Sequence, residues 1–277
     1  MKNFVKNIVT GVIRNDFAWS VLKPISSFGI FLNTTRKLSK EQKCRLDIER
    51  KIFQKLEVQN GPFKGMKYPK IAAVGSAIYP KLLGSYEKEL WEVVKEFKNN
   101  NYTEIIDVGC AEGYYAIGFG LAIETALIYA YDNNEKARNL CKEMGQLNNI
   151  QTRLCIKEEC TADELGSFQF TGRGLIISDC EGFERQLFNT VNVQNLLNCD
   201  LIIETHDFVD IEISTFLKEI FNKTHNIFSI KSTDDIEKAL TYEFEEIQAL
   251  NLPQRKKLLA ESRPSIMEWI ICKSKAA

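Results

Sequence analysis

The feature that most constrains the fold is an alternation of short apolar runs with helical patterns, which begins near Ser85 and continues through the rest of the sequence. Seven runs predict strands, at 104–108, 126–132, 151–157, 174–179, 200–205, 225–231 and 267–273. Helices are predicted at 114–123, 134–147, 181–190 and 211–221. Short, continuously apolar strands that alternate with helices are typical of a mostly parallel sheet covered on both faces. We therefore predict an α/β fold, a doubly wound sandwich on a seven-stranded, mostly parallel sheet.

The first 80 residues lack this alternation. A helix is predicted over 37–57 from the spacing of its apolar residues, and it is expected to stop at the helix breaker at 60–62, Asn-Gly-Pro. We interpret residues 1–80 as an N-terminal helical cap and connector, and residues 81–277 as the main domain. The cap either packs against the rest of the chain or serves as a lid over a substrate.

Charge and cysteine content narrow the class of protein. The chain has 36 Lys and Arg against 37 Asp and Glu, so no nucleic-acid partner is expected. None of the eight cysteines forms a C-x-x-C pair, which argues against a zinc ribbon and against a thioredoxin motif. Reduced thiols in a cytoplasmic protein are the better interpretation.

Two apolar segments resemble membrane spans at first sight. Residues 113–131 carry one charge, but the pattern predicts a helix followed by a strand. Residues 24–35 are uncharged yet too short to cross a bilayer, and no secretory signal pattern is present, so no transmembrane segment is expected. By default the aromatic and aliphatic stretch 17–32 is expected to pack on its own domain or on a second copy in a homo-oligomer, and the alternative is a peripheral contact with a membrane surface.

The loop after the first predicted strand reads DVGCAEG, with a carboxylate at the strand end and small residues before a helix. The candidate ligand-binding positions are Asp107, Gly109, Cys110, Ala111 and Gly113. Small residues here let backbone N–H groups approach a ligand closely. The dinucleotide fingerprint G-x-G-x-x-G is absent, which disfavours a nicotinamide-dependent oxidoreductase. A strand-end carboxylate at this position can hold a cation, where it would repel a pyrophosphate.

The second predicted strand also ends in an acid. Asp132 lies 23 residues after Gly109, where a carboxylate can accept hydrogen bonds from two ribose hydroxyls. The two loops together resemble those of S-adenosylmethionine (SAM)-dependent methyltransferases with a Rossmann-like fold, which implies SAM as the cofactor. The alternative is that Asp107 and Asp132 only cap the helices that follow them.

Polar residues follow the fourth and fifth predicted strands, where chemistry is expected. Asp179 and Glu181 follow strand four, and Glu204 and His206 end strand five. A histidine beside carboxylates can act as a general base near neutral pH. We assign His206 as the proton acceptor, with Asp179 and Glu181 orienting the substrate hydroxyl or the base.

Two alternatives to this assignment stay open. Asp179, Glu204 and His206 could hold a divalent metal that binds the substrate oxygen, although we commit to no metal. His206 could also merely cap its loop. His225, the second histidine, is expected to be structural.

The segments DVGCAEGYY, DCEGFE and IIETHDF together resemble the FkbM-type methyltransferases, over roughly residues 85–210. The stretch GSYEKEL also matches the family, with Glu87 at the position of its acid, and this implies a role for Glu87 at the cofactor. The resemblance makes 81–277 a SAM-dependent methyltransferase domain. It implies O-methylation of a hydroxyl on a small molecule or glycan, such as a sugar of a polysaccharide, glycolipid or natural product. The alternative function is a non-catalytic SAM-fold binding or scaffold module.

Overall fold

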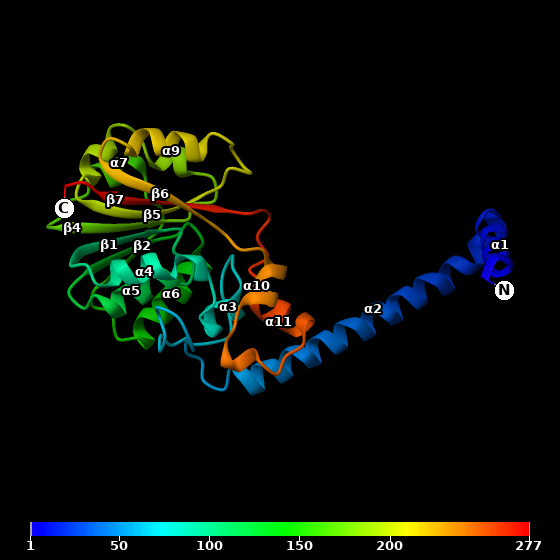
Figure 1. Ribbon diagram of the computed structural model, residues 1–277. Coiled ribbons are helices and arrows are strands. Elements are labelled where there is room, and N and C mark those ends of the chain that lie inside the picture. The colour runs from blue at the N-terminus through cyan, green and yellow to red at the C-terminus, as the bar shows by residue number, and fades with distance from the viewer. Residues whose placement is uncertain (1, 277) are drawn as a thin grey trace. The chain divides into compact units, whose positions relative to one another are not determined.

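The computed structural model describes the backbone of residues 2–276, and all side chains in that range except those at positions 2–5, 7, 8, 41, 44, 45 and 48 (Figure 1). The chain forms two compact units, of which the first extends to Gln54 and the second begins at Lys55.

The second unit contains a seven-stranded sheet. Its strands are β1 (Tyr102–Val108), β2 (Leu127–Tyr131), β3 (Leu154–Lys157), β4 (Arg173–Ser178), β5 (Cys199–Thr205), β6 (His225–Lys231) and β7 (Glu268–Ser274). Their order across the sheet is β3-β2-β1-β4-β5-β7-β6. Strands β1 to β5 run parallel, whereas β7 is antiparallel to both β5 and β6. This confirms the predicted fold class, and every predicted strand overlaps an observed one.

Helices cover both faces of the sheet. Figure 1 shows α4 (Trp91–Lys98), α5 (Tyr114–Ala122) and α6 (Glu135–Leu147) on one face, with α7 (Ala162–Ser167) and α9 (Ile213–Phe221) on the other. The segment 113–131 therefore forms a helix and a strand, as predicted. Helix α9 turns an apolar stripe to the sheet, with Ile213, Leu217 and Phe221 all fully buried.

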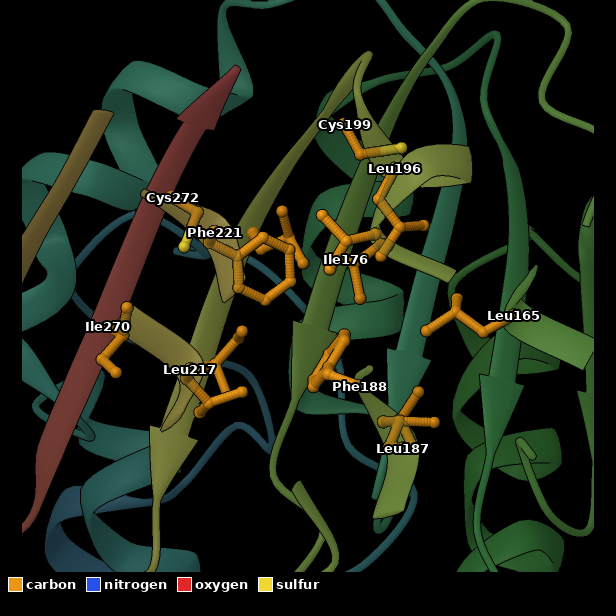
Figure 2. Close-up of a cluster of buried hydrophobic side chains, with 14 of the residues drawn as sticks. Leu165, Ile176, Leu187, Phe188, Leu196, Cys199, Leu217, Phe221, Ile270 and Cys272 are labelled. Carbon is orange, nitrogen blue, oxygen red and sulfur yellow. The ribbon is translucent and has the colours of Figure 1, made fainter. Parts of the chain in front are cut away.

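The core on the α9 side is a tightly packed apolar layer (Figure 2). Phe188 and Phe221 meet edge to face at 5.6 Å between ring centroids. Ile176 of β4 and Ile270 of β7 contribute to the same layer and are fully buried. This burial of both sheet faces keeps the strand ends in fixed positions, and the loops after those ends build the site described below.

The predicted helix at 181–190 is much shorter than expected. Only Glu184–Leu187 forms an α-helix (α8), followed by a 3₁₀ turn η2 at Asn192–Leu196. Glu181 and Gly182 have φ angles of 55° and 100°, in the left-handed region that an α-helix excludes. The prediction was wrong because helical spacing of apolar residues does not show where the backbone must turn.

A further group of helices lies beside the sheet. It comprises α3 (Ile78–Leu83), α10 (Asp235–Thr241) and α11 (Leu252–Leu259), with the 3₁₀ turns η1 (Lys88–Leu90) and η3 (Glu245–Ile247). Helix α11 contacts both α10 and α3. Segments far apart in the chain therefore pack together next to the site.

The first unit is helical, as predicted for the N-terminal extension. It consists of α1 (Lys2–Ile13) and α2 (Asp16–Ile52), and the side chain of Asn15 caps α2 by accepting a hydrogen bond from the backbone N–H of Ala18. Helix α2 starts 21 residues before the predicted 37–57 helix and ends five residues earlier, since Phe53 leaves the helical conformation. No helix in the described range is long and apolar enough to cross a membrane. The seven cysteines with described side chains are all free thiols.

Candidate active site

The carboxyl ends of β1, β2, β4 and β5 surround a cavity of about 640 Å³, which is a normal size for a small-molecule site. In doubly wound sheets ligands bind at this edge, where the strand order reverses. Most of the residues singled out in the sequence line the cavity: Asp107, Gly109, Cys110, Ala111, Asp132, Asp179, Glu181 and His206. The sheet thus brings together loops that are far apart in the sequence.

The loop after β1 lies directly against the loop after β4. Gly109 has a φ of 80°, and a Cβ atom there would lie 1.7 Å from the backbone oxygen of Asp179. Gly113, with a φ of 90°, begins α5 in the left-handed conformation. A side chain at Gly109 would force the two backbone segments apart, and one at Gly113 would be strained by the positive φ and would lie 2.8 Å from Sγ of Cys141.

Asp107 and Asp132 hold the loops together. Oδ2 of Asp107 accepts a hydrogen bond of 2.9 Å from the backbone N–H of Ala116 in α5. Oδ2 of Asp132 accepts one of 2.8 Å from Ala111, and its Oδ1 accepts one of 2.8 Å from Asn134. Asp107 therefore satisfies a backbone donor in the first turn of α5, whereas the side chain of Asn134 caps α6, and both Asp107 and Asp132 line the cavity.

The pKa of Asp107 lies above its usual value. Burial raises the pKa of Asp107 to about 7, and the negative charge of Asp179 adds to this, while the hydrogen bond from Ala116 opposes it. A buried carboxylate with this pKa ionises at neutral pH more readily when a cation binds next to it.

His206 forms a dyad with a carboxylate that the sequence analysis left without a role. Nδ1 of His206 lies 2.6 Å from Oε1 of Glu184, and both side chains are buried. Because a carboxylate accepts, Nδ1 carries the proton, and Nε2 is the nitrogen left to exchange a proton with a ligand. Burial works to lower the pKa of His206, but the hydrogen bond to Glu184 and the charge of Asp179 outweigh it and raise the pKa above its usual value.

Asp179 and Glu181 stand beside this free nitrogen. Nε2 of His206 lies 3.4 Å from Oδ1 of Asp179 and 3.6 Å from Oε2 of Glu181. Oδ1 of Asp179 is buried and has no hydrogen-bond partner within the described residues. Burial raises the pKa of Asp179 to about 6, against the lowering effect of His206. An unpaired buried oxygen at the cavity calls for a partner supplied by a ligand.

Within the described part of the chain, Asp179, Glu181 and His206 form the group that could hold a metal ion, because their donor atoms all lie within 4.8 Å of one another. Two carboxylates and an imidazole suit a divalent cation of moderate hardness. The metal ligands considered from the sequence included Glu204, whereas the structure groups Glu181 with Asp179 and His206. Glu204 is instead paired with Arg263.

Arg263 lines the cavity, as do Glu204 and Glu261, and it links three carboxylates. Its guanidinium donates hydrogen bonds to Glu204, to Glu87 at 2.5 Å and to Glu261 at 2.9 Å. Glu87 is buried and also accepts a hydrogen bond from Tyr115. Both oxygens of Glu87 are therefore engaged by the protein, so its predicted contact with a cofactor would act through Arg263 and Tyr115.

A second buried ion pair includes Glu112 of the loop after β1. Lys81, which lines the cavity, pairs with Glu112 at 2.6 Å, and both side chains are almost fully buried. Sequence reasoning missed this pair and Arg263, since no local pattern connects residues 31 or 176 positions apart. Glu184 could have been found, because it is the last acid of the D-x-E-G-x-E segment.

His225 has the structural role that was expected for it. It is buried away from the cavity, with Nε2 3.0 Å from the carbonyl oxygen of Cys199 and Nδ1 2.8 Å from the hydroxyl of Thr224. Burial lowers the pKa of His225, which keeps the imidazole neutral.

Comparisons with known proteins gave structural likenesses only. No family model matches the chain, and no curated protein matches it. A putative O-methyltransferase from Klebsiella pneumoniae is 10% identical, with a TM-score of 0.46, over 69% of this chain and 80% of that chain. The O-methyltransferase TomG from Streptomyces achromogenes, solved with SAM, is 9% identical, with a TM-score of 0.47, over 74% and 82%. An O-methyltransferase from Bacillus cereus, solved with SAH, is 11% identical, with a TM-score of 0.46, over 69% and 81%.

The contact at Gly109 yields a prediction about stability. Gly109→Ala is expected to lower the free energy of unfolding by about 3 kcal/mol or more, because the new Cβ collides with backbone and the φ is unfavourable. Gly65→Ala is the matched control, since Gly65 also has a positive φ but nothing within 4 Å, and it should cost about 1 kcal/mol. Denaturant unfolding measures both. Equal losses would mean that the loops do not need this close approach.

Proposed function

We propose that the protein is a SAM-dependent O-methyltransferase that acts on a hydroxyl group. The observation that carries the proposal is that the His206–Glu184 dyad opens onto the same cavity as Asp107 and Asp132. A base and a cation-compatible loop are thereby placed within one small-molecule site. The resemblance of the DVGCAEG and DCEGFE segments to the FkbM-type methyltransferases supports the same class.

The residues at the cavity fit the cofactor. Asp132 follows β2 and lines the cavity; each of its carboxylate oxygens accepts one backbone hydrogen bond and keeps a lone pair that can accept a ribose hydroxyl. The loop from Gly109 to Gly113 allows close backbone approach. Asp107 offers a carboxylate to a positive group. When bound, SAM supplies a methyl group activated by a sulfonium.

The protein's part in the reaction is alignment and proton removal. His206 would accept the proton of the acceptor hydroxyl at Nε2, while a bound SAM would give up its methyl group to the acceptor oxygen and leave as S-adenosylhomocysteine. Glu184 holds the imidazole by Nδ1 and compensates the positive charge that the ring acquires. Asp179, with its unpaired Oδ1, and Glu181 orient the hydroxyl against Nε2.

The acceptor we propose is a sugar hydroxyl of a polysaccharide, glycolipid or natural product. Two exposed aromatic rings line the cavity, Phe183 and Phe208, and they offer apolar faces on which a sugar ring can lie. The free thiols agree with the cytoplasmic location expected from the sequence.

Asp179, Glu181 and His206 also favour a second chemical route, in which they hold a divalent cation that binds the acceptor oxygen. Turnover measured with and without EDTA separates the two routes. A base mechanism keeps its rate in EDTA, and a metal mechanism loses it.

The pKa of Asp107 predicts how SAM binding depends on pH. A free site with a pKa of about 7 is mostly protonated at pH 6, and a bound cation favours the ionised carboxylate. Affinity should therefore rise about fivefold to tenfold between pH 6 and pH 7.5, with proton release on binding near pH 6. Calorimetry in buffers of different ionisation enthalpy measures both quantities. Asp107→Asn, which keeps the acceptor for Ala116, should remove the dependence, and a flat wild-type profile would contradict this role.

Replacement of the proposed base tests catalysis. His206→Gln is expected to leave SAM affinity nearly unchanged while lowering methyl transfer by at least about 100-fold on a hydroxylated acceptor. The measurement is release of S-adenosylhomocysteine with a panel of sugar and glycolipid acceptors.

His225→Gln is the control, because His225 lies outside the cavity and should keep its turnover if the variant folds. Unchanged turnover in His206→Gln would remove His206 from the mechanism. SAM binding without turnover on any acceptor would favour the scaffold alternative.

A further inference from the structure

The two compact units of the chain carry opposite charge. Residues 1–54 contain 11 Lys and Arg against 4 Asp and Glu, a surplus of 7 positive charges. The remaining residues contain 25 against 33, since the whole chain has 36 and 37. The near-neutral total therefore conceals a basic helical unit. A basic segment of this kind is attracted to an anionic partner.

Helix α2 of this unit also presents a continuous apolar stripe. Phe17, Val21, Ile25, Phe28 and Leu32 follow one another at intervals of four, four, three and four, so they share one face of the helix. Each of the five is at least half exposed, and Phe17 is 80% exposed. An exposed row of large apolar side chains marks an interaction surface.

The opposite face of the same segment is of a different kind. Lys23 and Ser27 lie there together with Trp19 and Ile30, each about 120° to 180° from the middle of the stripe. Between Asp16 and Glu41 the sequence has no acidic residue, whereas Lys23, Arg36 and others supply positive charge. The segment therefore combines a continuous apolar stripe, a mixed opposite face and a basic character.

We propose that residues 17–32 of α2 bind in the plane of an anionic lipid bilayer, with the Phe17–Leu32 stripe inserted at the level of the headgroups. These features are those of interfacial amphipathic helices. The basic residues pair with lipid phosphates, each contributing through its charge near the surface. This docking is independent of the proposed methyl transfer, and it brings the second unit to a surface where lipid-linked acceptors are found.

The lipid surface fits better than a second copy of the chain. Two basic units brought together would repel each other, because the surplus of 7 positive charges would face an equal surplus. An anionic bilayer offers an apolar interior to the stripe and negative headgroups to the basic residues. Self-association through the stripe is accordingly the competing outcome of the test.

The test is co-sedimentation of the full chain with vesicles of phosphatidylcholine that contain about 30% phosphatidylglycerol, compared with pure phosphatidylcholine. We expect binding to the anionic vesicles, weakened by added salt. Ile25→Ser should weaken this binding about fivefold or more, since it removes an apolar side chain from the stripe.

Ile30→Ser is the matched control, because Ile25 and Ile30 are both isoleucines of α2, both are 65% exposed, and they lie about 140° apart around the helix. It should change vesicle binding less than twofold. Lys37→Glu, an exposed charge reversal, should weaken binding to anionic vesicles only. Circular dichroism checks that the variants keep their helices.

Three results would overturn the proposal. The first is no binding to anionic vesicles, and the second is equal loss in Ile25→Ser and Ile30→Ser. The third is a concentration-dependent oligomer that Ile25→Ser dissociates while vesicles bind nothing, which would assign the stripe to contact between copies.

Discussion

The close approach of the loops after β1 and β4 is the constraint on which the site depends. At Gly109 the backbone comes so near to Asp179 that no side chain fits between them. This contact places the loop after β1, with Asp107 at its start, and the loop after β4, with Asp179 and Glu181, beside one cavity. Packing on both faces of the sheet holds the strand ends in register, so the loops can stay close without any covalent link.

The proximity of these loops also creates the electrostatics of the cavity. Burial is the main cause that raises the pKa of both Asp107 and Asp179, and the negative charge of Asp179 raises the pKa of Asp107 further. Lys81 and Arg263 offset part of the negative charge, but both are already paired with glutamates. The cavity therefore retains carboxylate oxygens in excess of cations. A positively charged ligand would find these oxygens already in place, which is the physical basis for proposing SAM rather than a nucleotide.

Much of the fold could be predicted because its signals are local. Buried parallel strands are apolar runs, and their carboxyl ends bring Asp107, Asp132, Asp179 and His206 to one edge of the sheet. Features made by distant pairs could not be predicted. Arg263 meets Glu87 across 176 positions, and nothing in either segment identifies the partner. The helix expected at 181–190 is shorter than predicted because the left-handed backbone at Glu181 and Gly182 is not visible in the spacing of apolar residues.

The measurement that tests the central claim most directly is calorimetric titration of the chain and of Asp132→Ala with SAM, S-adenosylhomocysteine and NAD. The account predicts binding of SAM and S-adenosylhomocysteine to the wild-type chain and none of NAD. It also predicts affinity weaker by about 1.5–3 kcal/mol in the variant, the scale of a hydrogen-bonded charged group. Binding of NAD in place of SAM, or wild-type SAM affinity in Asp132→Ala, would contradict it.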